Sequence, residues 1–157
     1  MCNKLEETLH KRFIEKKLTL SIAESCTGGS LAARFTRMPG ASGYFLGSVV
    51  AYSYQLKLKL LGVPEDLLRE KGEVSQEVVE KMAEGILKLT ESDFALAVSG
   101  IAGPTGGTPE KPVGTVWCGI GQRNGSIYTW KIQCDGSREM IIEQSINALL
   151  TELLSRT

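Results

Sequence analysis

The feature that most constrains the fold is an alternation of two hydrophobic periods along the first half of the chain. Leu5, Leu9 and Phe13 recur at every fourth residue, which is the spacing of one face of a helix. Residues 18–23 and 45–52 are short apolar runs of strand length, and a helix that opens with residues 27–30 is expected between them. A chain that alternates helices and strands in this way folds with helices against a sheet.

The second half of the chain departs from this alternation. Residues 94–99 form a continuous apolar run, which is typical of a strand buried on both faces. Residues 114–121 and 126–134 follow as two strand-like segments, and Asn124-Gly125 between them favours a tight hairpin. A last helix is expected from about Ser137, and Ser53 and Ser75 are expected to start two helices before residue 94. We therefore predict an α/β fold with three layers, α/β/α, around a mixed, largely parallel sheet.

Length and composition fit one domain that spans residues 1–157. The chain has 42% hydrophobic and 23% charged residues, as globular proteins do, which excludes a disordered or collagen-like chain. Its N-terminal segment is charged where a signal peptide would be apolar. No apolar run reaches the roughly 18 residues of a membrane span. We expect a cytoplasmic protein that has no membrane partner.

Charge and metal-binding residues exclude further classes. Eighteen basic residues balance eighteen acidic ones, so a large basic surface for nucleic acid is not expected. Cys2, Cys26, Cys118 and Cys134 form no zinc spacing and are expected to be free thiols. The single histidine, His10, argues against a Ser-His-Asp triad and a histidine zinc site. We expect no metal and no cofactor, and a homo-oligomer, with a dimer as the working assumption.

Two glycine-rich segments follow apolar runs, at residues 24–29 and 99–107. Loops at the carboxyl ends of strands are where open α/β sheets bind ligands. In the first segment, the amides of a helix start and the hydroxyls of Ser25 and Thr27 are suited to an anion. A tight turn is the plain alternative for each segment, but their equivalent positions favour a ligand site. The candidate binding residues are Ser25, Thr27, Gly28, Gly29, Gly100 and Gly103.

A third candidate site combines a serine, a tyrosine and a lysine. Ser42 lies in a glycine-bounded turn, Tyr52 ends the next apolar run, and Lys57 falls one turn into the following helix. A serine attacks only when a base takes its proton, and a buried lysine is the available base. Cys26 is a competing nucleophile, because a helix start favours a thiolate. Glu24 either pairs with a cationic ligand or caps the helix. A turn cap and a solvated lysine are the structural alternatives.

These motifs resemble the CinA C-terminal family, whose characterised activity is the deamidation of nicotinamide mononucleotide. The resemblance runs from about residue 5 to residue 155, nearly the whole chain. Some relatives have an additional N-terminal domain, and the chain resembles the stand-alone form. The segments that carry the resemblance are 23–29, 47–53 with Lys57, 60–63, 72–75 and 99–116.

The resemblance implies an amidohydrolase that converts nicotinamide mononucleotide into nicotinic acid mononucleotide and ammonia by a serine mechanism without metal. Ser42 matches the family's nucleophile, Lys57 its general base and Tyr52 its assisting hydroxyl. The other matched residues line the site or contact the substrate: Ser25, Ser99 and Arg138.

Two other functions stay open at this stage. One is a non-catalytic domain of the same fold that binds a nucleotide or a protein partner, although the presence of Ser42, Tyr52 and Lys57 argues for catalysis. The other is an amidase for a related amide, which a panel of substrates with and without the 5′-phosphate distinguishes. A DNA-associated role is disfavoured by the zero net charge.

Overall fold

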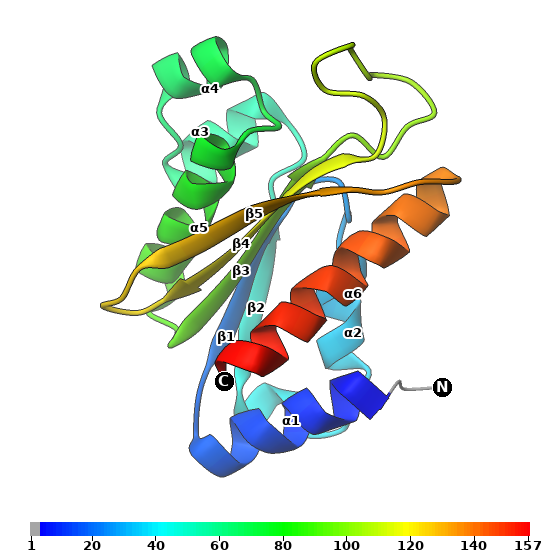
Figure 1. Cartoon of the computed structure of the whole chain (residues 1–157). Helices are drawn as coiled ribbons and strands as arrows, with labels where there is room; N and C mark the ends of the chain where they lie inside the picture. Colours follow the sequence, from blue (N-terminus) through cyan, green and yellow to red (C-terminus); the bar gives the residue numbers. More distant parts are fainter. Residues whose placement is uncertain (1–3) are drawn as a thin grey trace.

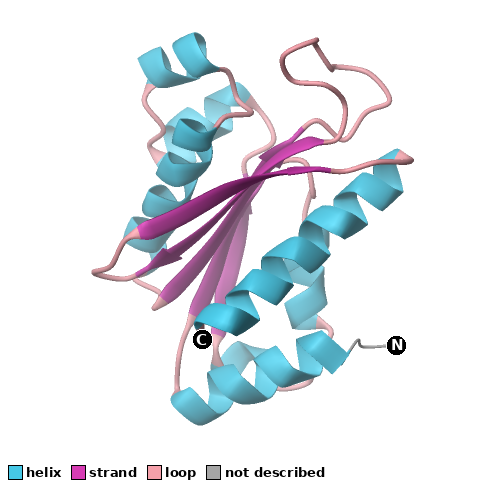
Figure 2. Cartoon of the chain, viewed as in Figure 1, coloured by secondary structure: helices cyan, strands magenta, loops and turns pink. Residues whose placement is uncertain are grey.

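A twisted sheet runs through the centre of the molecule, with helices on both of its faces (Figure 2). The computed structural model describes residues 4–157, and this part of the chain forms one sheet of five strands. The strands are β1 (Leu20–Glu24), β2 (Phe45–Val50), β3 (Phe94–Gly100), β4 (Thr115–Gln122) and β5 (Ile127–Gln133).

The strands follow the order β2-β1-β3-β4-β5. β1 pairs in parallel with β2 and with β3, whereas β4 is antiparallel to both β3 and β5. The carboxyl ends of β1, β2 and β3 therefore lie at one edge of the sheet. The predicted mixed sheet is confirmed, with a parallel core and an antiparallel hairpin that turns at Asn124-Gly125.

The two faces of the sheet carry side chains of different size. Along β3, Leu96 and Val98 belong to one core, whereas Ala95 and Ala97 belong to the other. The large side chains pack against α1 (Lys4–Lys16), α2 (Ser30–Thr36) and α6 (Arg138–Arg156). The small side chains pack against α3 (Tyr54–Leu61), α4 (Glu65–Lys71) and α5 (Gln76–Thr90), on the opposite side in Figure 1. The three-layer α/β/α fold is confirmed.

Serine caps fix the start of three helices, as their positions in the sequence predict. The hydroxyl of Ser53 accepts a hydrogen bond from an amide at the start of α3, and Ser75 and Ser137 do the same for α5 and α6. The helix predicted from residue 27 instead begins at Ser30. Gly28 and Gly29 before it have φ angles of 57° and 99°, which lie outside the helical range.

Two findings concern the expectations on membranes and thiols. No helix within residues 4–157 combines the length and the apolar character that a membrane crossing needs. Cys26, Cys118 and Cys134 are buried free thiols, as predicted, and Cys2 lies outside the described residues.

Candidate functional site

A pocket of about 160 Å³ lies at the edge of the sheet where β1 and β3 end. Ser25 directly follows β1, and Ser99 and Gly100 end β3, so the parallel strands bring the two glycine-rich segments together. The pocket is lined by Ser25, Cys26, Tyr52, Lys57, Glu73, Val74, Ser99, Gly100, Ala102 and Arg138.

The central contact of the pocket joins Ser25 and Lys57. The Lys57 ammonium donates a hydrogen bond to the Ser25 hydroxyl at 3.0 Å, and both side chains are buried. The amide of Ser25 donates to the carbonyl of Val98 at 3.0 Å, which fixes the serine against β3. A hydroxyl within hydrogen-bond reach of an amine is the arrangement of a nucleophile and its general base.

Two further acceptors surround the Lys57 nitrogen. It donates to the carboxylate of Glu73 at 3.1 Å and to the carbonyl of Tyr52 at 3.4 Å. Together with the Ser25 hydroxyl these acceptors match the three protons of an ammonium group. The Lys57 nitrogen is therefore enclosed by three acceptors, and the Ser25 hydroxyl is one of them.

Arg138 and Tyr52 form the exposed rim of the pocket. The Arg138 guanidinium donates to the Tyr52 hydroxyl and to the carbonyl of Gly103, each at 2.9 Å. These bonds hold Arg138, the first residue of α6, over the pocket. Because the Tyr52 hydroxyl accepts from Arg138, its own proton remains available for a ligand. Gly103 itself contributes to the site through Arg138 and does not line the pocket.

The structure separates Ser42 from Tyr52 and Lys57, and the predicted grouping of these three residues is wrong. Ser42 lies in the short 3-10 helix Ala41–Gly43 before β2, whereas Tyr52 follows the end of β2. An extended strand advances about 3.3 Å per residue, so six residues of β2 place the two at opposite edges of the sheet. In Figure 1, β2 begins at the edge beside α1. Ser42 lines a separate surface cavity.

The anion site predicted at the first glycine segment is also wrong, because a side chain of the protein occupies it. The buried Glu24 carboxylate accepts hydrogen bonds from the amides of Gly29, Leu31 and Ala32, at 3.0 to 3.1 Å. The Thr27 hydroxyl donates to the same carboxylate at 2.6 Å. The helix-capping alternative for Glu24 is therefore confirmed. Thr27, Gly28 and Gly29 lie outside the pocket lining.

Replacing Glu24 by glutamine is expected to lower the free energy of unfolding by about 2–3 kcal/mol, since hydrogen bonds to a buried charged group weaken together. Urea unfolding followed by circular dichroism measures this change. The matched control is Glu70→Gln, an exposed carboxylate on α4, for which we expect a change below about 0.5 kcal/mol. Equal midpoints for the two variants would contradict the capping role of Glu24.

Cys26 lines the pocket as a neutral thiol. Burial, together with the nearby charge of Glu24, raises the pKa of the Cys26 thiol to about 12. The predicted helix-start effect on this thiol is wrong, because Glu24 already neutralises the start of α2. At neutral pH Cys26 is therefore part of the pocket wall and a poor competitor of Ser25 for the role of nucleophile.

Sequence reasoning missed Glu73 as a site residue. It lies in the loop between α4 and α5, and its carboxylate contacts Lys57 from a side chain that is 44% exposed. Its backbone carbonyl accepts a hydrogen bond of 2.8 Å from the buried Ser99 hydroxyl. The signal available in the sequence was its place within the segment 72–75, directly before the cap of α5.

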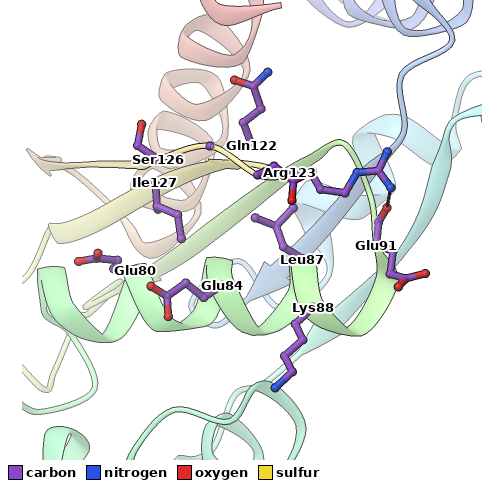
Figure 3. Close-up of a pocket in the computed structure, with 11 residues that line it drawn as sticks. Glu80, Glu84, Leu87, Lys88, Glu91, Gln122, Arg123, Ser126 and Ile127 are labelled. Carbon is purple, nitrogen blue, oxygen red and sulfur yellow. Dashed lines mark hydrogen bonds between the residues drawn. The ribbon is translucent and has the colours of Figure 1, made fainter.

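A larger cavity, of about 670 Å³, lies between α5 and the β4–β5 hairpin (Figure 3). None of the predicted site residues lines it. Figure 3 shows Arg123 bonded to the carbonyl of Glu91, with Glu80 and Glu84 at the other end of the groove. Within residues 4–157, no group of three His, Cys, Asp or Glu side chains is placed to hold a metal ion. The small pocket is therefore the candidate site.

Sequence comparison finds relatives over nearly the whole chain. A family model described as "CinA C-terminal domain" matches residues 2–157. A CinA-like protein of Thermotoga neapolitana is 49% identical over 150 residues, which cover 96% of this chain and 36% of that protein. A putative competence-damage inducible protein of Desulforudis audaxviator is 45% identical over 92% of this chain and 35% of its own length. The chain thus spans about a third of these relatives.

Solved structures of similar proteins share the fold. The competence damage-inducible protein A (ComA) of Klebsiella pneumoniae superposes with a TM-score of 0.92 at 34% identity, over 96% of this chain and 92% of that one. A competence-damaged protein (CinA) superfamily protein from Escherichia coli gives a TM-score of 0.94 at 30% identity, over 100% and 91% of the two chains.

Proposed function

The chain belongs to the CinA C-terminal domain family, and we propose that it is a serine amidohydrolase that deamidates nicotinamide mononucleotide. The products are nicotinic acid mononucleotide and ammonia. The observation that carries the proposal is the 3.0 Å contact of Ser25 with Lys57 in the pocket. His10, the single histidine, lies on α1 with its ring against Tyr44, so Lys57 is the base that we propose. Because Lys57 contacts Ser25, the nucleophile that we propose is Ser25, in place of Ser42.

In the first step, the Ser25 oxygen attacks the carboxamide carbon while Lys57, as the neutral amine, takes the hydroxyl proton. The C=O bond opens to an oxyanion, and we assign its stabilisation to a hydrogen bond that the Tyr52 hydroxyl donates. The tetrahedral intermediate then collapses, and Lys57 gives its proton to the leaving nitrogen, which departs as ammonia. The substrate is left as an ester on Ser25.

In the second half of the reaction, a water molecule replaces the leaving group. Lys57 takes one proton from the water as its oxygen attacks the ester carbon. The second intermediate expels the Ser25 oxygen, which recovers a proton from Lys57. Nicotinic acid mononucleotide leaves, and both side chains return to their starting state.

Arg138 supplies a positive charge for the 5′-phosphate of the substrate. A guanidinium pairs with phosphate through two parallel hydrogen bonds, and Arg138 is already oriented by Tyr52 and Gly103. Its position at the exposed rim suits the distal end of a nucleotide whose carboxamide reaches Ser25. Ser99 and Gly100 supply the wall between these two points.

The proposal is tested by ammonia release from nicotinamide mononucleotide, nicotinamide riboside and nicotinamide. We expect release from the mononucleotide, with kcat/KM at least about tenfold lower for the riboside because it lacks the phosphate contact to Arg138. A folded protein that releases no ammonia from the mononucleotide contradicts the proposal. Equal hydrolysis of all three compounds would favour the amidase for a related amide.

A further inference from the structure

We propose that Glu73 recognises the positive charge of a pyridinium ring, so that the pocket selects cationic N-substituted pyridinium carboxamides over uncharged amides. This inference rests on the proposed function, because it specifies that the pocket recognises the charged ring of that substrate. It adds a specificity-determining residue to the site, at a position that sequence reasoning did not single out.

The position of Glu73 is fixed although its side chain is accessible. Its backbone carbonyl accepts the hydrogen bond of the buried Ser99 hydroxyl, which ties the loop between α4 and α5 to the end of β3. The carboxylate is 44% exposed and lines the pocket. A ligand can therefore reach a negative charge whose backbone is held in place.

Among the charged groups around the pocket, Glu73 is the one that attracts a cation. Among the described residues that line the pocket, Glu73 carries the single negative charge, and Lys57 and Arg138 carry positive charges. Arg138 suits the phosphate of the substrate, and Lys57 is the proposed base. A positively charged ring in this pocket is repelled by Arg138 unless it lies against the Glu73 carboxylate.

The spacing of the reacting groups matches that of a pyridinium carboxamide. Ser25, Lys57 and Glu73 form a chain of two hydrogen bonds, of 3.0 and 3.1 Å, so the carboxylate lies close to the nucleophile. In the substrate, a single CH group separates the charged ring nitrogen from the carbon that bears the carboxamide. A carboxamide placed at Ser25 therefore brings the ring charge within reach of Glu73.

Pairing with the ring also changes the contacts of Lys57. In the structure the Lys57 ammonium donates a hydrogen bond to Glu73. When the ring cation takes over the carboxylate, Lys57 keeps the Ser25 hydroxyl and the Tyr52 carbonyl as partners. An uncharged amide leaves the ion pair of Glu73 with Lys57 intact.

A binding experiment separates this inference from the proposed reaction. Calorimetry on Ser25→Ala protein, which does not consume its ligand, measures the Kd of nicotinamide mononucleotide and of its 1,4-dihydro form. The two ligands share the carboxamide, ribose and phosphate, and differ in ring charge. We expect Glu73→Gln in this background to weaken the cationic ligand about threefold to tenfold and the neutral ligand less than twofold, as the half-exposed carboxylate gives a moderate effect.

The matched control is Glu70→Gln, which removes the same charge from the surface of α4 and should leave both Kd values unchanged. Equal weakening of both ligands by Glu73→Gln, or no change for either, overturns the inference. Ammonia release by the protein with Ser25 intact reports separately on the reaction. Turnover of the mononucleotide with no ring-charge selectivity refutes the inference alone, whereas selective binding without ammonia release refutes the proposed reaction alone.

Discussion

Ser25→Ala is expected to lower kcat for nicotinamide mononucleotide by at least about 10³-fold, because it removes the hydroxyl that contacts Lys57. The substitution deletes one oxygen from the edge of the sheet and keeps the backbone bond to Val98, so the unfolding midpoint should change little. Ammonia release and thermal unfolding of the same preparation measure both effects.

The control for this variant is Ser42→Ala, which makes the same chemical change at an exposed serine. Ser42 lies at the far end of β2 in its own surface cavity, so we expect kcat within about twofold of wild type. Ser25 is not the nucleophile if the two variants exchange their effects, with Ser42→Ala inactive and Ser25→Ala active. That result would restore the assignment made from the sequence.

Lys57→Met is expected to lower kcat by about 10²- to 10⁴-fold, the range over which a general base contributes. Methionine has a similar shape and fills the same buried space without a charge. The charged partner that remains, Glu73, is half-exposed and stays in contact with solvent, so the free energy of unfolding should change little. Loss of activity with unchanged stability is a combination that a purely structural lysine does not give.

Lys59→Met provides the comparison on the same helix. Lys59 is exposed, lies outside the pocket lining, and should keep both activity and stability close to wild type. Two results would remove Lys57 from the proposed mechanism. One is a Lys57→Met protein with wild-type turnover, and the other is a loss of activity that follows unfolding of the protein.

The fold was predictable from the sequence because its signals are local. Ser53, Ser75 and Ser137 precede helices, and Asn124-Gly125 joins two strands, so each of these boundaries can be read from a few neighbouring residues. The start of α2 was placed too early. The φ angles of the two preceding glycines depend on the turn that Glu24 organises, and the residue pattern does not carry that information.

The site was predicted only in part, because its contacts depend on strand order. Ser25 and Lys57 are 32 residues apart and meet since β1 lies beside β2 with both strands pointing the same way. Ser42 is nearer to Lys57 in sequence, but an extended strand lies between them. Glu73 joins the site through its bond to Ser99, a contact between distant segments that leaves no local pattern.

The most direct test of the central claim is to trap the covalent intermediate. The wild-type protein is mixed with nicotinamide mononucleotide, quenched in acid within the first turnover, digested and analysed by peptide mass spectrometry. We expect a nicotinoyl mononucleotide ester on Ser25, absent from Ser25→Ala protein and present in Ser42→Ala protein. The same adduct on Ser42 or Cys26 would contradict the assignment of Ser25 as the nucleophile.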